Sequence, residues 1–137
     1  MIKEAIVDSG IWIASKIEGS ENKKAESILE AFSNSNIKKI YITNYVLLES
    51  VNFLLRKKHF DIALEIYDYL TKTDRINLIH IDENMSMRIR ELFEKYKTFS
   101  VTDCSMIVLA EDYNIKYLFS LDSDFDKVKG LIRKESF

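Results

Sequence analysis

Residues 5–12 read AIVDSGIW: an apolar triplet, one carboxylate, two small residues and a second apolar pair. The triplet Ala5–Val7 is short and apolar at every position, which is typical of a strand buried on both faces of a sheet. Ile11–Ala14 continues as a short helical segment. Asp8 stands between the two, where aspartate is a favoured helix N-cap. The stretch therefore predicts a strand followed at once by a helix, with an acidic residue at the junction.

The same alternation of strand and helix continues along the chain. Strands that alternate with helices need crossover connections, so we expect the strands to run parallel and helices to cover the sheet. The predicted fold is α/β, a three-layer α/β/α sandwich with a parallel central sheet of four to five strands. Ser20 is the expected N-cap of one helix, and Phe93 is expected on the inward face of another. Beyond the first strand and helix, the expected strands are 40–42, 76–81 and 117–119, with 130–132 as a candidate edge strand. The expected helices are 21–32, one that Thr43 or Asn44 caps and that ends at 56–58, and 60–70, 83–96 and 103–113.

The composition is ordinary for a globular protein. The chain has 137 residues, a formal net charge of -2, no proline and one cysteine. This length predicts that residues 1–137 form one domain. One cysteine excludes an internal disulfide and a Cys/His zinc motif. We expect a cytoplasmic protein without a membrane partner, because the chain has neither a long apolar span nor the layout of a signal peptide. The near-zero charge argues against binding nucleic acid by bulk basicity, but it does not exclude a nucleic-acid enzyme.

Most carboxylates lie on polar helix faces among lysines, where a solvated side chain is the simplest interpretation. The exceptions follow or interrupt apolar segments: Asp8, Glu49, Asp103 and the run Asp122–Asp126. Each has a structural explanation on its own. Asp8 can cap a helix, Asp103 can complement a helix dipole, Glu49 can lie at the boundary of an amphipathic helix, and the run can form a polar turn.

Taken together, these acids indicate a metal site. A parallel sheet brings the carboxyl ends of its strands to one edge, where Asp8 and Asp122 would each follow a strand. Clustered carboxylates repel one another and persist mainly where a cation neutralises them. Oxygen ligands favour Mg²⁺ or Mn²⁺, and such ions activate water and assist displacement at phosphorus.

Four short motifs, in this order and spacing, resemble the PIN domain, and most of all the VapC-type toxins of toxin–antitoxin pairs. The resemblance covers nearly the whole chain. It implies a metal-dependent endoribonuclease that hydrolyses RNA phosphodiester bonds with one or two Mg²⁺ or Mn²⁺ ions. It also implies a homodimer and inhibition by a small antitoxin protein. The motifs are Val7-Asp8-Ser9, Leu48-Glu49, Ser100-Val101-Thr102-Asp103-Cys104 and Ser120-Leu121-Asp122-Ser123-Asp124-Phe125.

By this resemblance, the catalytic and metal-binding quartet is Asp8, Glu49, Asp103 and Asp122. Asp8 and Asp103 would be the most direct metal ligands. Glu49 and Asp122 would act through water, through a second cation or by orienting other groups. Asp124 is an additional candidate ligand and competes with Asp122 for the fourth role.

Hydroxyl and basic residues complete the expected site. Ser9 and Ser120 resemble the small hydroxyl residues that stand beside the family's acids, although the family commonly has threonine where Ser120 stands. Neither His59 nor His80 lies in a motif, which disfavours a metal-free ribonuclease with paired histidines. Basic side chains can position RNA through its phosphates. The candidate RNA contacts are Arg56, Lys57, Lys58 and Lys127.

Other functions compete with the toxin. A phosphotransfer enzyme would use an aspartate after the first strand, but haloacid-dehalogenase-like phosphatases need D-x-D where this chain has Asp8-Ser9-Gly10, and a receiver domain needs an acidic pair before its first helix. A PIN nuclease of RNA processing and a non-catalytic PIN-fold interaction module remain alternatives. Without the four proposed site acids the chain would carry a formal charge of +2. We therefore expect an acidic pocket in a mildly basic surface, with modest non-specific affinity for RNA.

Overall fold

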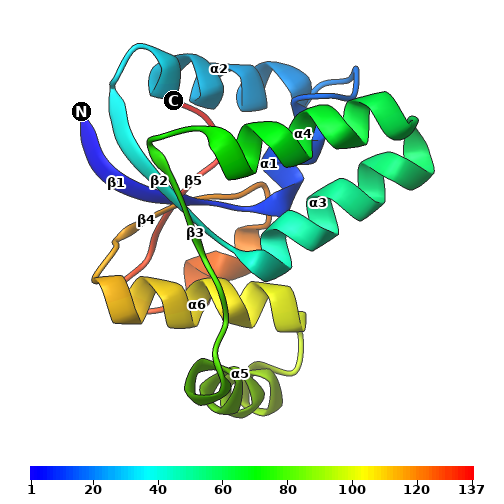
Figure 1. Cartoon of the computed structure of the whole chain (residues 1–137). Helices are drawn as coiled ribbons and strands as arrows, with labels where there is room; N and C mark the ends of the chain where they lie inside the picture. Colours follow the sequence, from blue (N-terminus) through cyan, green and yellow to red (C-terminus); the bar gives the residue numbers. More distant parts are fainter.

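A five-stranded parallel sheet lies at the centre of the computed structural model, which describes residues 1–137 (Figure 1). All four neighbouring strand pairs are parallel. The predicted α/β class and parallel sheet are therefore confirmed. The strands are β1 (Ile2–Val7), β2 (Ile37–Thr43), β3 (Ile76–Ile79), β4 (Tyr117–Phe119) and β5 (Ile132–Lys134), and they lie in the order β3-β2-β1-β4-β5.

Helices cover both faces of this sheet, as predicted (Figure 1). The first four helices lie on one side, and α5 and α6 lie on the other. This arrangement follows from the strand order, because the chain first moves outward from β1 to β3 and then returns to build β4 and β5 on the other side of β1. The helices are α1 (Ser9–Ala14), α2 (Asn22–Ser33), α3 (Asn44–Lys57), α4 (Phe60–Lys72), α5 (Glu83–Tyr96), α6 (Val101–Tyr113) and the short 3-10 helix η1 (Ser123–Lys127).

The core lies between the sheet and its two helical layers. Ala5, Ile6 and Val7 of β1 are completely buried, as expected for the central strand. Residues 104–110 of α6 are all buried, because α6 packs between the sheet and α5. Trp12 of α1 is buried as well, and its indole N–H donates to the Val7 carbonyl oxygen at 3.2 Å. The short helix is thereby held against the end of β1.

Several local predictions were wrong, among them the edge strand, which is Ile132–Lys134 rather than 130–132, and three of the errors have a clear physical reason. Helix α2 begins at Asn22 rather than after Ser20, and the Asn22 side-chain amide donates to the Ala14 carbonyl oxygen at 2.9 Å. Phe93 is 46% exposed, because α5 packs through Met85 and Ile89 instead. Strand β3 ends at Ile79, opposite the last residue of β2, and does not continue to residue 81. None of the helices combines the length and apolar character needed to cross a membrane.

Candidate active site

Asp8 lies where β1 ends and α1 begins. Its backbone is extended, and its carboxylate Oδ1 accepts the Ser9 backbone N–H at 2.7 Å, so it caps the helix as predicted. Its own N–H donates to the Phe119 carbonyl oxygen of β4 at 2.9 Å. Asp8 is therefore fixed between β1 and β4, where the strand order changes direction. In parallel sheets this switch point is the usual position of a ligand site.

Ser120 connects Asp8 to the loop that follows β4. The fully buried Ser120 hydroxyl donates to Asp8 Oδ2 at 2.7 Å. The hydroxyl oxygen of Ser120 in turn accepts the Asp122 backbone N–H at 3.1 Å. One side chain thus holds the carboxylate after β1 next to the acidic turn after β4.

Ser9 connects the same carboxylate to α3. Its hydroxyl donates to Glu49 Oε1 at 2.7 Å and lies 3.3 Å from Asp8 Oδ1. Thr43 accepts the Val46 backbone N–H at 3.2 Å and starts α3 at the end of β2, which brings Glu49 to the same sheet edge. Glu49 is exposed, so its charge within an apolar segment stays in contact with solvent.

Asp103 lies in the first turn of α6. The helix begins at Val101, so Asp103 does not open it as expected but closes a capping box with Ser100. Asp103 Oδ2 accepts the Ser100 N–H at 2.9 Å, and the Ser100 hydroxyl accepts the Asp103 N–H at 3.0 Å. The hydroxyls of Thr43 and Ser105 meet at 2.9 Å in a buried hydrogen bond that joins the β2–α3 junction to α6. The Asp103 carboxylate is therefore held at the same edge as Asp8.

The acids at this edge form one electrostatic cluster. Burial raises the pKa of Asp8 to about 6, against the opposing effect of the Ser120 hydrogen bond, and the charges of Asp103 and Glu49 raise it further. Burial also raises the pKa of Asp103, with added contributions from the charges of Asp122 and Glu49. Each predicted member of the quartet thus interacts with at least one other member.

The donor chemistry of this cluster fits a hard divalent cation. Its ligands are carboxylate oxygens, which Mg²⁺ and Mn²⁺ prefer, and a bound cation would relieve the repulsion among them. No three acidic, histidine or cysteine side chains lie close enough together to hold an ion in this conformation. Since Glu49 and Asp122 are exposed, their side chains have the room to rotate toward an ion.

Asp122 and Asp124 differ in their surroundings. Asp122 caps η1 by accepting the Asp124 N–H at 2.9 Å, and its charge acts on Asp103. The Asp124 carboxylate instead pairs with Lys127 at 3.6 Å. Of the two candidates for the fourth acid, only Asp122 interacts electrostatically with the rest of the cluster. Lys127, a predicted RNA contact, adjoins the cluster through this ion pair.

The other predicted RNA contacts lie farther away. Arg56–Lys58 end α3, seven to nine residues beyond Glu49, which is roughly 10–14 Å along a helix. They make no ion pair within the chain. His59 and His80 are exposed and make no hydrogen bond to the acids.

Arg133 of β5 was not identified from the sequence. Its side chain is only 14% exposed and donates to the Ser120 carbonyl oxygen at 3.1 Å and to Asp126 at 2.9 Å. It therefore fixes the turn that carries Ser120 and Asp122. The available signal was an arginine within an apolar edge segment, since a buried charge needs partners.

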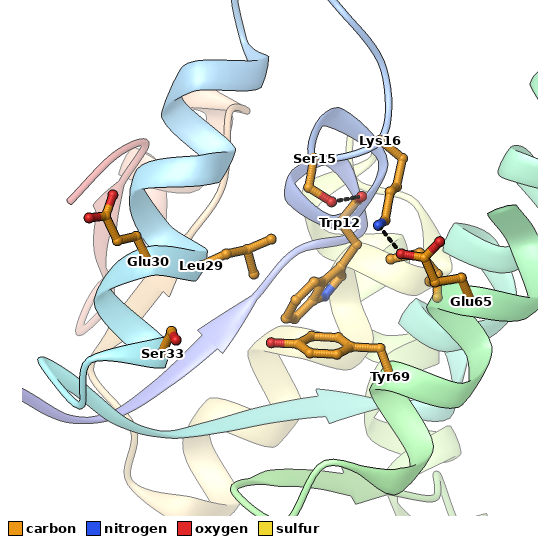
Figure 2. A pocket seen from close by; sticks show the side chains of 9 residues that line it. Trp12, Ser15, Lys16, Leu29, Glu30, Ser33, Glu65 and Tyr69 are labelled. Carbon is orange, nitrogen blue, oxygen red and sulfur yellow. Dashed lines mark hydrogen bonds and ion pairs between the residues drawn. The ribbon is translucent and has the colours of Figure 1, made fainter.

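A cavity of about 420 Å³ lies among α1, α2 and α4 (Figure 2). Figure 2 shows the Trp12 indole beside the Tyr69 ring, with Leu29 of α2 directed toward them. The two rings meet edge to face with centroids 6.1 Å apart. An ion pair between Lys16 and Glu65 lies at its border. None of the four clustered acids lines this apolar cavity, so it is separate from the candidate active site.

Comparison with known proteins agrees with the fold. The family profile of the PIN domain matches residues 5–131. No curated protein sequence matches the chain. Among solved structures, Mycobacterium tuberculosis VapC20, described as a toxin that cleaves the sarcin–ricin loop, superposes with a TM-score of 0.78 at 16% identity, covering 89% of this chain and 92% of that chain.

Two toxin–antitoxin assemblies contain similar chains. One is a toxin–antitoxin complex from Klebsiella pneumoniae, with a TM-score of 0.67 at 19% identity, covering 93% of this chain and 95% of that chain. The other is VapBC2 from Rickettsia felis bound to a DNA fragment of its promoter, with a TM-score of 0.68 at 17% identity, covering 96% and 97%. At these identities the structural likeness establishes the shared fold alone.

Proposed function

The chain belongs to the PIN-domain family, and from this premise we propose that it is a metal-dependent endoribonuclease that acts in the cytoplasm as the toxin of a type II toxin–antitoxin pair. The observation that carries the proposal is the connection of Asp8 to Glu49 through Ser9 and to the Asp122 turn through Ser120. Carboxylates from three distant parts of the chain meet there at the sheet's switch point. The known structures with this fold include a toxin that cleaves RNA at the sarcin–ricin loop.

The residues of the cluster have separable tasks. Asp8 and Asp103 are the direct ligands, and Asp122 and Glu49 complete the acidic site. When bound, Mg²⁺ or Mn²⁺ would lower the pKa of a water molecule and polarise the scissile phosphate. Ser9 and Ser120 orient the carboxylates by donating to Glu49 and Asp8. Only Oε1 of Glu49 is engaged within the protein, so Oε2 is free to accept a hydrogen bond from water.

The test of this function is cleavage of a panel of structured RNAs in the presence of Mg²⁺ or Mn²⁺. We expect discrete fragments from at least one RNA. Expression of the active protein should arrest growth, whereas a catalytically inactive variant should not. Cleavage without growth arrest would favour the RNA-processing alternative, and metal binding without cleavage of any RNA would favour the non-catalytic module.

Ser120→Ala should weaken the apparent affinity for Mn²⁺ and the activity by roughly 10–100-fold, because groups that orient metal ligands typically contribute that much. The substitution removes the only side-chain donor to Asp8 Oδ2. Ser120→Thr keeps the hydroxyl and should restore most of the loss. A Mn²⁺ titration of cleavage measures both effects, and equal activation midpoints for the alanine variant and wild type would contradict the assigned role.

We also propose that a small antitoxin protein binds the chain. The support is that chains of this fold occur in toxin–antitoxin complexes. Co-expression with a short neighbouring reading frame should yield a complex that survives purification and no longer cleaves RNA. An active enzyme whose cleavage no neighbouring gene product affects would remove the toxin assignment and leave the nuclease assignment intact.

A homodimer is the expected assembly. Phe60, Leu64 and Tyr67 are exposed at positions that share one face of α4, an apolar stripe without a partner in the monomer. A second copy of the chain would cover such a stripe. Light scattering should give twice the mass of one chain, whereas a monomer at micromolar concentration would contradict this assembly.

A further inference from the structure

A groove of about 650 Å³ lies between α5, α6 and the segment after η1, on the opposite side of the sheet from α1–α4. We call it the lysine groove, because the exposed side chains of Lys95, Lys116, Lys127 and Lys129 line it. Its floor is apolar and includes the buried residues Ile107 and Val128. The lysine groove therefore combines an apolar floor with a positively charged border.

The charge of the groove is not balanced by its surroundings. Glu111 is its only acidic lining residue, and Arg88 lies 3.7 Å from that carboxylate. No carboxylate lies within ion-pair distance of Lys95, Lys116 or Lys129. In a chain whose formal net charge is -2, this is a local concentration of free positive charge. Such a surface attracts a polyanion.

One end of the groove adjoins the acidic cluster. Lys127 ends η1, which Asp122 caps, and pairs with Asp124 at 3.6 Å. An aromatic chain fixes this end, since the Phe99 ring meets Tyr96 at 5.0 Å and stacks on Phe125 at 4.8 Å between centroids. The aromatic contacts therefore hold both this end of the groove and the turn that carries Asp122 and Asp124.

The other end of the groove lies beside the C-terminus of α6. Asn114 and Lys116 line it there, whereas Asp103 lies in the first turn of the same helix. These ends of α6 are roughly 16 Å apart. The groove therefore leads away from the acidic cluster along α6, over a length that accommodates several successive phosphates.

We propose that the lysine groove binds the sugar–phosphate backbone of the RNA substrate beyond the scissile bond. This inference rests on the proposed nuclease function, and it adds a binding surface distinct from the acidic cluster. Lysines hold phosphates as point charges without reading bases, so the groove supplies affinity rather than sequence choice. The half-buried Tyr96 ring, with Lys95 Nζ 5.2 Å from its centroid, offers a small stacking surface at the wall.

The test is the double charge reversal Lys116→Glu/Lys129→Glu. These residues are exposed and unpaired, so the fold should persist, and circular dichroism verifies this. The control is Lys23→Glu/Lys72→Glu, which makes the same charge change on α2 and α4, on the opposite side of the sheet, and also removes the exposed pair of Lys72 with Asp68. If the double reversal disturbs folding, Lys116→Gln/Lys129→Gln replaces it.

The probe is fluorescein-labelled oligouridylate, whose binding is followed by anisotropy in EDTA so that binding is measured without cleavage.

We expect the groove variant to bind the probe at least roughly tenfold more weakly. The slope of log K against log salt should fall in magnitude by about 1.4, because each lost contact with a single strand removes about 0.7. The control variant should stay close to wild type. Equal affinity and slope for the groove variant and wild type would overturn the proposal. It would also be overturned if oligoglutamate, an acidic peptide, bound wild type more tightly than the RNA probe and the groove variant lost this binding.

The outcome also separates this inference from the nuclease function. If wild type cleaves RNA with Mn²⁺ and the groove variant has the same KM, the groove assignment fails and the nuclease stands. If wild type binds oligouridylate through the groove in EDTA but cleaves no RNA with any divalent ion, the nuclease assignment fails and the groove remains an RNA-binding surface.

Discussion

Replacing Asp8 by asparagine should lower RNA cleavage by at least about 1,000-fold, since loss of a metal ligand removes several kcal/mol of transition-state stabilisation. The fold should survive. Asparagine matches aspartate in shape, keeps an acceptor for the Ser9 N–H and can donate its amide to the Ser120 hydroxyl oxygen. Initial rates on a cleaved RNA measure the effect.

The same substitution should stabilise the metal-free protein near neutral pH. The pKa of Asp8 rises from 3.8 to about 6 on folding, mainly through burial. A carboxyl group with a raised pKa favours the fold fully below pH 3.8, and this contribution is lost as the pH rises through about 6. The loss amounts to about 3 kcal/mol in wild type. Asp8→Asn has no such titration, so its stability advantage should grow from pH 4 to pH 7.

Urea unfolding in EDTA at both ends of this pH range measures the stabilisation. Asp124→Asn is the matched control, because it makes the same chemical change on an exposed turn where the carboxylate pairs only with Lys127. It should leave activity and the pH dependence of stability near wild type. Undiminished cleavage by Asp8→Asn would refute the role assigned to Asp8. If the stability of Asp8→Asn changed with pH as that of wild type does, the Asp8 carboxyl group would not be the group whose pKa burial raises.

Removal of divalent metal should abolish cleavage, and Mn²⁺ or Mg²⁺ should restore it. The ion should also raise the unfolding temperature of wild type by several degrees, because a ligand at 100 times its Kd adds about 2.7 kcal/mol to stability. Burial and, to a smaller extent, repulsion among the carboxylates raise the pKa values of Asp8 and Asp103, and a bound cation would neutralise that repulsion.

Asp103→Asn should lose both the metal-dependent activity and the metal-dependent rise in unfolding temperature. The α6 cap should remain, because an asparagine side-chain oxygen can still accept the Ser100 N–H. Asp74→Asn is the control, since Asp74 is exposed and makes no ion pair. Full cleavage after exhaustive chelation would contradict the metal-dependent chemistry. A metal-induced stabilisation retained by Asp103→Asn would exclude Asp103 as a ligand.

Local patterns were sufficient to predict most of the fold. The helix Glu83–Tyr96 and the strand Tyr117–Phe119 were predicted to the residue, because each is an apolar pattern with polar ends. The errors occur where contacts between residues distant in the sequence determine where an element ends or which side chain it buries. Strand β3 stops because β2 stops beside it, and the Ile81 N–H donates to the Asn44 side chain at 2.8 Å instead of to a strand. Phe93 faces outward because α5 buries its other face, through Met85 and Ile89.

The candidate site divides in the same way. Its acidic residues could be identified from the sequence, because acids at the ends of apolar segments are unusual. Their connections were not, because the bond from Ser9 to Glu49 exists only once α3 packs on α1. The Arg133 contact with the Ser120 carbonyl oxygen likewise depends on the pairing of β5 with β4.

The bond from Ser120 to Asp8 also sets a time at which activity can appear. These residues are 112 positions apart in the chain, and at 5–20 residues per second a ribosome needs about 6–22 s to travel between them. Until then the nascent chain carries Asp8 without its partner from β4. A polypeptide released early from the ribosome therefore lacks the second half of the site and is inert. Under the proposed nuclease function, the nascent chain would therefore stay inactive until Ser120 has been added and β4 has paired with β1.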